Sequence, residues 1–242
     1  RPVRGVQVSA WKPRRFWKIA SPAPVDGGWT VRLDDRPVKT PAKALLVVPT
    51  EAMACAIAAE WDAQEGEVRP ETMPVTRAAN SALDKVATQY DEVAAMLAAY
   101  AGSDLLCYRA TGPEPLVARQ AAGWDPLLAW AQADLDLPLA VTSGVMPIAQ
   151  GGQVLPRALA LAAGLGPFRL AAFHDLVAIS GSFVLAMAVI KGRLSVAEAW
   201  DLSRIDEAWQ IEEWGEDDEA TALAAVRRAD FEQAARFFDL CG

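Results

Sequence analysis

The run LVAISGSFVLAMAVI, residues 176–190, is a long apolar stretch without a charged side chain, and it lies between Asp175 and Lys191. A helix of this length rises about 22 Å, whereas the hydrocarbon core of a bilayer is roughly 30 Å thick. The run is therefore too short to span a membrane, and it also contains two serines and a glycine. It predicts the central helix of a protein core.

Helical periodicity extends along most of the chain on both sides of this run. Ala, the best helix former, accounts for 48 of the 242 residues. The segment SVAE at residues 195–198 is typical of a capping box at a helix start. Gly and Pro separate the helical segments, and residues 137–152 are an expected loop. Helices are predicted over residues 76–101, 115–134 (kinked near Pro126), 157–164, 167–191, 195–214 and 218–238.

The first part of the chain has a different pattern. Residues 16–19 and 29–33 indicate strands, the first broken by prolines and the second alternating polar and apolar side chains. Residues 34–36 are a predicted turn, and Thr50 is placed to cap a helix. We therefore expect an α+β protein, with a small β-rich α+β domain at residues 1–75 and an all-α bundle of antiparallel or crossed helices at residues 76–242.

Composition excludes several classes of function. The formal net charge is −8 and the pI is about 4.8, which argues against a nucleic-acid-binding protein. Three cysteines without short spacing and a single histidine argue against a disulfide framework and a structural zinc site. No phosphate-binding loop is present. We expect no catalytic residue, no cofactor, no metal and no small-molecule substrate.

The most unusual segment is acidic and contains two tryptophans. Residues 206–219 carry eight carboxylates and no basic side chain, whereas the first 18 residues are purely basic. On a helix, three- and four-residue steps place one group on a single face: Asp206, Trp209, Gln210, Glu213 and Trp214. Such carboxylates repel one another, so the cluster favours a metal or a basic partner. That partner is either the basic N-terminal segment of the chain or another molecule.

Tryptophan is also abundant elsewhere, with nine in the chain. Several stand beside charged residues, as Trp61 does between Glu60 and Asp62. Tryptophan is enriched at the centres of protein interfaces, which favours a binding function. The alternative is that these side chains border the two domain cores.

Five segments, in order along the chain, resemble the assembly chaperones of the catalytic sector of ATP synthase, the Atp-twelve type. They are EWDAQ (60–64), MPVTRAAN (73–80), DLLCYRA (104–110), RQ with WDPL (119–127) and WQIEEWG (209–215). Ala78 stands where this family commonly has Leu. The WGED ending is similar to the bacterial branch.

The resemblance implies a chaperone without enzymatic activity that binds the free α subunit of ATP synthase. It would shield the surface that faces the β subunit until β replaces it. The resemblance also implies an orthogonal helical domain, an important acidic residue at Asp206 or Glu207, and a role for Trp61. The predicted binding residues are Asp206, Glu207, Trp209, Gln210, Glu213, Trp214 and Trp61.

We expect a monomer in the bacterial cytoplasm, or in the mitochondrial matrix if the chain is eukaryotic. Two alternatives remain open at this point. One is a hydrolase that uses the carboxylate cluster or a metal bound there. The other is a structural adaptor for an unrelated partner.

Overall fold

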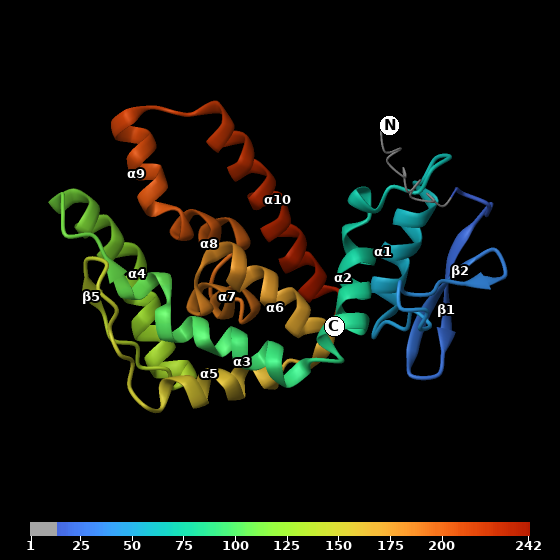
Figure 1. Cartoon of the computed structure of the whole chain (residues 1–242), viewed down its shortest axis with the longest axis horizontal. Coiled ribbons are helices and arrows are strands. Elements are labelled where there is room, and N and C mark those ends of the chain that lie inside the picture. Colours follow the sequence, from blue (N-terminus) through green and yellow to red (C-terminus); the bar gives the residue numbers. More distant parts are fainter. Residues whose placement is uncertain (1–13) are drawn as a thin grey trace, which may run out of the picture. The chain divides into compact units, whose positions relative to one another are not determined.

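The alternating segment around Val31 forms the middle strand of a small antiparallel sheet. A computed structural model of the protein (Figure 1) describes residues 14–242, which divide into two compact units between Arg77 and Ala78. In the first unit the strand order is β1(Ala20–Val25), β2(Gly28–Leu33), β3(Arg36–Pro37). The predicted turn lies between β2 and β3, where Asp34 adopts φ 51°.

The first strand begins later than the sequence indicates. The prediction of a strand at residues 16–19 is wrong, because β1 starts at Ala20 and includes Pro22 and Pro24. Those prolines pair with Val31 and Trp29 of β2. They are tolerated because β1 is an edge strand and residues two apart direct their nitrogens to the same side, here the open edge. The sheet therefore loses no ladder hydrogen bond to them.

One helix covers this sheet. In α1(Glu51–Asp62), the predicted cap is present, since the Thr50 hydroxyl accepts from the Met53 N–H at 3.1 Å. Met53 and Ile57 are fully buried, and α1 packs against β1 and β2. The short helix η1(Pro70–Thr72) follows, and then α2(Pro74–Ser81), within which the division between the units falls. The Glu60 carboxylate accepts from the Val75 and Thr76 N–H groups at the start of α2.

The second unit is helical apart from one two-stranded parallel pair, β4(Tyr108–Arg109) with β5(Thr142–Ser143) (Figure 1). The predicted α+β class is confirmed. The helical elements of the second unit after α2 are η2(Ala82–Val86), α3(Tyr90–Tyr100), η3(Ala101–Ser103), η4(Leu105–Cys107), α4(Glu114–Leu135), α5(Val154–Ala163), α6(Gly166–Ser180), α7(Phe183–Ile190), α8(Val196–Ser203), α9(Ile205–Trp214) and α10(Asp218–Asp239).

Three segments predicted as single helices are broken. Residues 76–101 contain the π-helical turn η2, after which the Thr88 hydroxyl donates to the carbonyls of Asp84 and Lys85. Residues 167–191 break at Gly181, which takes a left-handed conformation at φ 71° that glycine adopts without strain. Residues 195–214 break at Arg204, between α8 and α9. The capping box at the start of α8 is confirmed.

The uncharged run quoted above thus forms the centre of the core as two helices and not as one. Six of the eight residues of α7 are buried, and α6 packs against α3, α7 and α10. Within residues 14–242, no helix combines the length and apolar character needed to cross a membrane.

The start of α7 is held by a buried carboxylate from the DLLCYRA segment. Asp104 accepts from the Ser182 hydroxyl at 2.7 Å, the Val184 N–H at 3.0 Å and the Leu106 N–H at 3.0 Å. Burial raises the pKa of Asp104 from 3.8 to about 6, although these hydrogen bonds oppose the shift. Ionisation of Asp104 is therefore less favourable in the folded protein than in the unfolded chain.

This pKa predicts a pH-dependent stability. The pKa of Asp104 is higher in the folded protein than in the unfolded chain. Its side chain therefore contributes most to the free energy of unfolding below about pH 4, and this contribution is lost as the pH rises towards 6. Against Asp104→Asn, which does not titrate, the free energy of unfolding should fall by up to about 3 kcal/mol over that interval. Urea unfolding of both proteins from pH 4 to 7 measures the difference. A difference that stays constant or rises with pH would contradict the assignment.

Candidate partner-binding site

Helix α4 is the support for the acidic helix α9. The Gln120 side chain, only 1% exposed, donates from its amide to the Asp206 carboxylate at 2.6 Å and accepts from the Ala110 N–H at 2.8 Å. One turn further, the Trp124 indole N–H donates to the Leu202 carbonyl at 2.9 Å, just before α9 begins. Two of the segments that resemble the chaperone family, DLLCYRA and RQ with WDPL, therefore meet at Gln120.

A second pair of contacts fixes the rest of α9 on the same support. The Arg119 guanidinium donates to both carboxylate oxygens of Glu212, at 2.7 and 2.8 Å, and lies 5.0 Å from the Trp209 ring centre. Hydrogen bonding between them raises the pKa of Arg119 and lowers the pKa of Glu212. A bidentate pair fixes orientation better than a single contact does. Asp206, Trp209 and Glu212 thus form the side of α9 that faces α4.

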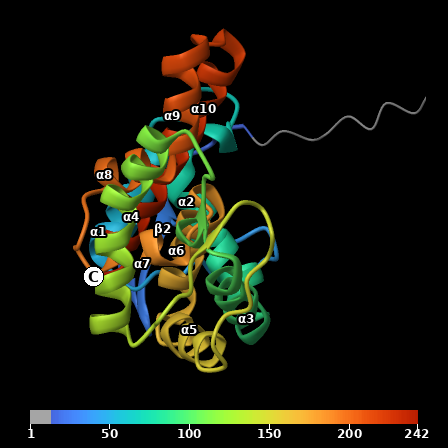
Figure 2. The same ribbon diagram turned by 90° about the vertical axis from the view of Figure 1, so that its left-hand side faces the viewer.

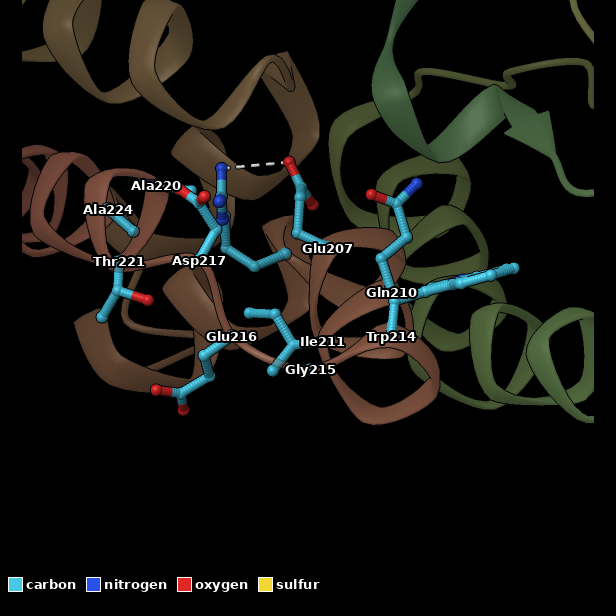
Figure 3. A pocket seen from close by; sticks show the side chains of 11 residues that line it. Glu207, Gln210, Ile211, Trp214, Gly215, Glu216, Asp217, Ala220, Thr221 and Ala224 are labelled. Carbon is cyan, nitrogen blue, oxygen red and sulfur yellow. Dashed lines mark hydrogen bonds and ion pairs between the residues drawn. The ribbon is translucent and has the colours of Figure 1, made fainter.

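The neighbouring side of α9 is open and borders a cleft of about 460 Å³ (Figure 3). It is lined from α9 and its flanks by Arg204, Glu207, Gln210, Ile211, Trp214 and Gly215, and from the α10 side by Glu216, Asp217, Ala220, Thr221 and Ala224. The Trp214 indole extends away from Thr221 and Ala224 in Figure 3 and is 87% exposed. Ile211 is 43% exposed. The lining therefore joins exposed apolar surface to carboxylates.

The cleft exists because α10 is packed only along its second half. The buried residues of α10 are Phe231, Ala234, Ala235 and Phe237, where the helix contacts α6. Nearly all of its first half is exposed, including Leu223 and Val226. In Figures 1 and 2 the α9–α10 end projects from the other helices of the second unit. Both helices thus present side chains beyond the core.

The turn between the two helices is sharp and depends on glycine. Gly215 ends α9 at φ 88° and ψ 170°, a conformation that essentially only glycine adopts. The Asp217 carboxylate then caps α10 by accepting from the Ala220 N–H at 2.7 Å. This turn connects the end of α9 to the start of α10 at one side of the cleft.

The acidic residues of this end differ in whether a cation neutralises them. Glu207 pairs with Arg204 at 3.0 Å and Glu212 pairs with Arg119. In the part of the chain that the structure describes, no cation forms an ion pair with Glu213, Glu216, Asp217, Asp218 or Glu219. The rim of the cleft consequently has a negative potential.

The structure divides the binding residues predicted on this helix. Asp206 and Trp209 lie towards α4, whereas Glu207, Gln210 and Trp214 line the cleft. Glu213 is exposed and lies outside the cleft lining. Sequence reasoning missed Arg204, Ile211 and the small residues of α10, namely Ala220, Thr221 and Ala224. A Gly-Glu-Asp turn between two helices was the available signal that α10 would lie opposite α9.

Trp61 belongs to the first unit and has a different environment. Its ring meets that of Trp17 edge to face, with centres 5.2 Å apart, and Trp17 is 4% exposed. The neighbouring residues of the EWDAQ segment also have structural contacts. Glu60 caps α2, and Asp62 accepts from the Ala20 N–H at 2.9 Å. These contacts favour the structural alternative for Trp61.

The sequence leaves a metal or a basic group, such as the N-terminal segment, as the partner of the acidic cluster. Of the basic residues near the N-terminus, Arg1, Arg4 and Lys12 lie outside the described residues, and Arg15 pairs with Asp62. Between residues 14 and 242, no three His, Cys, Asp or Glu side chains gather in a way that could hold a metal ion. The cations that do meet the carboxylates of α9 are Arg119 and Arg204.

Known proteins share both the sequence and this fold. The family described as ATP12 chaperone protein matches residues 14–132. Atp12 from Paracoccus denitrificans has a crystal structure that is 52% identical, with a TM-score of 0.93, covering 96% of this chain and 100% of that one. The crystal structure of the Atu1473 protein of Agrobacterium tumefaciens has a TM-score of 0.90 and a sequence identity of 40%. The match covers 95% of this chain and 87% of that one. The mitochondrial protein atp12 of Schizosaccharomyces pombe is 26% identical over 214 residues, which are 84% of this chain and 74% of that protein.

Identity of this extent, over nearly the whole of both chains, establishes the relationship. The chain belongs to the ATP12 chaperone family. The family that the five sequence segments indicate is thereby confirmed.

The separation of Asp206 from Glu207 predicts that two substitutions differ in their effect on stability. Asp206→Ala leaves the buried Gln120 amide without its acceptor and should lower the free energy of unfolding by about 2 kcal/mol. Glu207→Ala removes only an exposed ion pair and should change it by about 0.5 kcal/mol or less. Urea unfolding of both variants is the measurement. Equal losses would show that the two carboxylates do not have separate roles.

Trp61 should behave as a structural residue. Trp61→Ala removes the ring that packs on Trp17 and should lower the free energy of unfolding by about 2 kcal/mol. Trp61→Phe retains an aromatic ring and should lose less than half of that. Chemical denaturation provides the comparison. A Trp61→Ala protein with wild-type stability would instead assign Trp61 to binding.

Proposed function

We propose that this chaperone assists assembly of ATP synthase by binding the free α subunit in the cleft between α9 and α10. The observation that carries the proposal is the cleft itself, which joins exposed Trp214 and Ile211 to Glu216 and Asp217, two carboxylates that form no ion pair within residues 14–242. Contiguous apolar surface bordered by charge is typical of a protein-binding site. Family membership supplies the chaperone function, and the resemblance of the sequence segments supplies the α subunit as partner.

The physical action proposed for the cleft is temporary protection of an exposed interface. Trp214, Ile211 and the small residues of α10 would cover apolar surface of the α subunit that later contacts β. The carboxylates of the rim would attract a basic surface and orient it during encounter. Salt should therefore slow association more than it accelerates release, because exposed charges act mainly before contact. The β subunit would release the chaperone by competing for the same surface.

We propose that the chain acts as a monomer and has no catalytic activity. A bacterial cytoplasm is its proposed location, supported by the bacterial relatives at 52% and 40% identity, against 26% for the mitochondrial relative. No feature of the cleft favours the hydrolase or the unrelated adaptor over this function.

A binding experiment tests the proposal with matched variants. Immobilised α subunit should bind the wild-type protein, and added β subunit should displace it. Combining Glu207→Gln with Trp214→Ala should weaken binding by about tenfold, because it removes a rim charge and the most exposed apolar anchor of the cleft. Met146→Ala is the control, since Met146 is an exposed apolar residue outside the cleft.

Two results would count against this function. Absence of wild-type binding at low and moderate salt would remove the α subunit as partner. Equal losses in the cleft variant and in Met146→Ala would place the binding surface outside the α9–α10 cleft.

A further inference from the structure

Glu207 stands between two cavities of the second unit. One is the α9–α10 cleft described above, and the other is a smaller cavity of about 220 Å³ whose lining includes Trp124, Ser180 and Arg227. Arg204 and Glu207 line both. Their ion pair, the dashed line in Figure 3, therefore lies where the two cavities meet.

This ion pair has a single contact, whereas Arg119 contacts both carboxylate oxygens of Glu212, and both pairs are partly exposed. The Arg204 and Glu207 side chains are 26% and 44% exposed and make a single contact at 3.0 Å. Asp206 is instead held by a buried amide, and Glu212 by a bidentate guanidinium. Exposed pairs three residues apart on a helix contribute little to stability. Glu207 is thus the carboxylate of the α9 helix whose present partner is most easily replaced.

The lining of the cleft defines what could replace Arg204. Ile211, Ala220 and Ala224 provide an apolar wall, and Glu216 and Asp217 add negative charge at the turn. An aliphatic stem ending in a cation matches both features, because such side chains pack their methylene groups on apolar surface and keep the charge at a polar end. Arginine and lysine have this form, and arginine can also make a bidentate contact with a carboxylate.

We propose that a basic side chain of the bound partner enters the α9–α10 cleft and replaces Arg204 as the ion-pair partner of Glu207. Arg204 is then a specificity-determining residue. It forms the ion pair with Glu207 in the free chaperone, and only a competing cation of the partner displaces it. A partner with an apolar side chain at that position would leave the pair intact and gain nothing from Glu207. This inference rests on the proposed binding of the α subunit in the cleft.

Competition gives Arg204 a signature opposite to that of an ordinary contact residue. Removing it should strengthen binding, because Glu207 becomes available without displacement of a cation. Arg204→Gln should lower the Kd for isolated α subunit by about threefold, the range expected for an exposed ion pair. Arg227→Gln is the matched control, because it removes the same charge from the lining of the neighbouring cavity without an ion pair to Glu207.

A double-mutant cycle separates competition from a general change in charge. In a Glu207→Gln background, Arg204→Gln should no longer strengthen binding, whereas a purely long-range charge effect would persist. Arg204→Met serves as the second variant if Arg204→Gln does not fold, and circular dichroism verifies folding of each protein. Titration calorimetry or biolayer interferometry with purified α subunit gives the Kd values.

The outcomes are distinct. Stronger binding by Arg204→Gln than by Arg227→Gln, lost in the Glu207→Gln background, supports the inference. Unchanged or weaker binding by Arg204→Gln, with wild-type binding intact, overturns the inference alone. Equal gains in the two arginine variants overturn it as well. Failure of the wild-type protein to bind the α subunit overturns the proposed function and this inference together.

Discussion

The buried amide of Gln120 is the contact on which the arrangement of the binding surface depends. It joins the backbone at Ala110 to the Asp206 carboxylate of α9, and both groups would lose hydrogen bonds without it. A buried polar group left without a partner costs more free energy than a surface contact returns, so this contact specifies one orientation of α9 on α4. Once that orientation is set, Glu207, Ile211 and Trp214 line the cleft.

The same arrangement assigns different roles to neighbouring carboxylates. Asp206 and Glu212 are bound by side chains of α4, whereas Glu207 pairs with a half-buried arginine from the start of its own helix. The first half of α10 stands opposite, beyond the part of that helix that the core supports. A chaperone that releases its client requires a surface of moderate affinity, and exposed apolar groups bordered by weakly held charges provide one.

Local signals in the sequence predict the elements well, and non-local packing decides the rest. The cap at Thr50, the capping box at Ser195 and the last helix are confirmed because each depends on residues close in sequence. The break at Gly181 is missed because an apolar run has the same composition in one helix as in two. The sequence places Asp206 and Trp214 on one helical face, but the position of α4 divides that face, and helical periodicity contains no information about it.

Hydrogen–deuterium exchange of the full chain, alone and with purified α subunit, tests the central claim most directly. Exchange reports local opening and shielding of individual amides, so it locates a bound partner without a substitution. The account predicts slower exchange in α9 and in the first half of α10 when the α subunit is bound, and a return to free rates after β is added. Binding with slower exchange confined to other parts of the chain would contradict it.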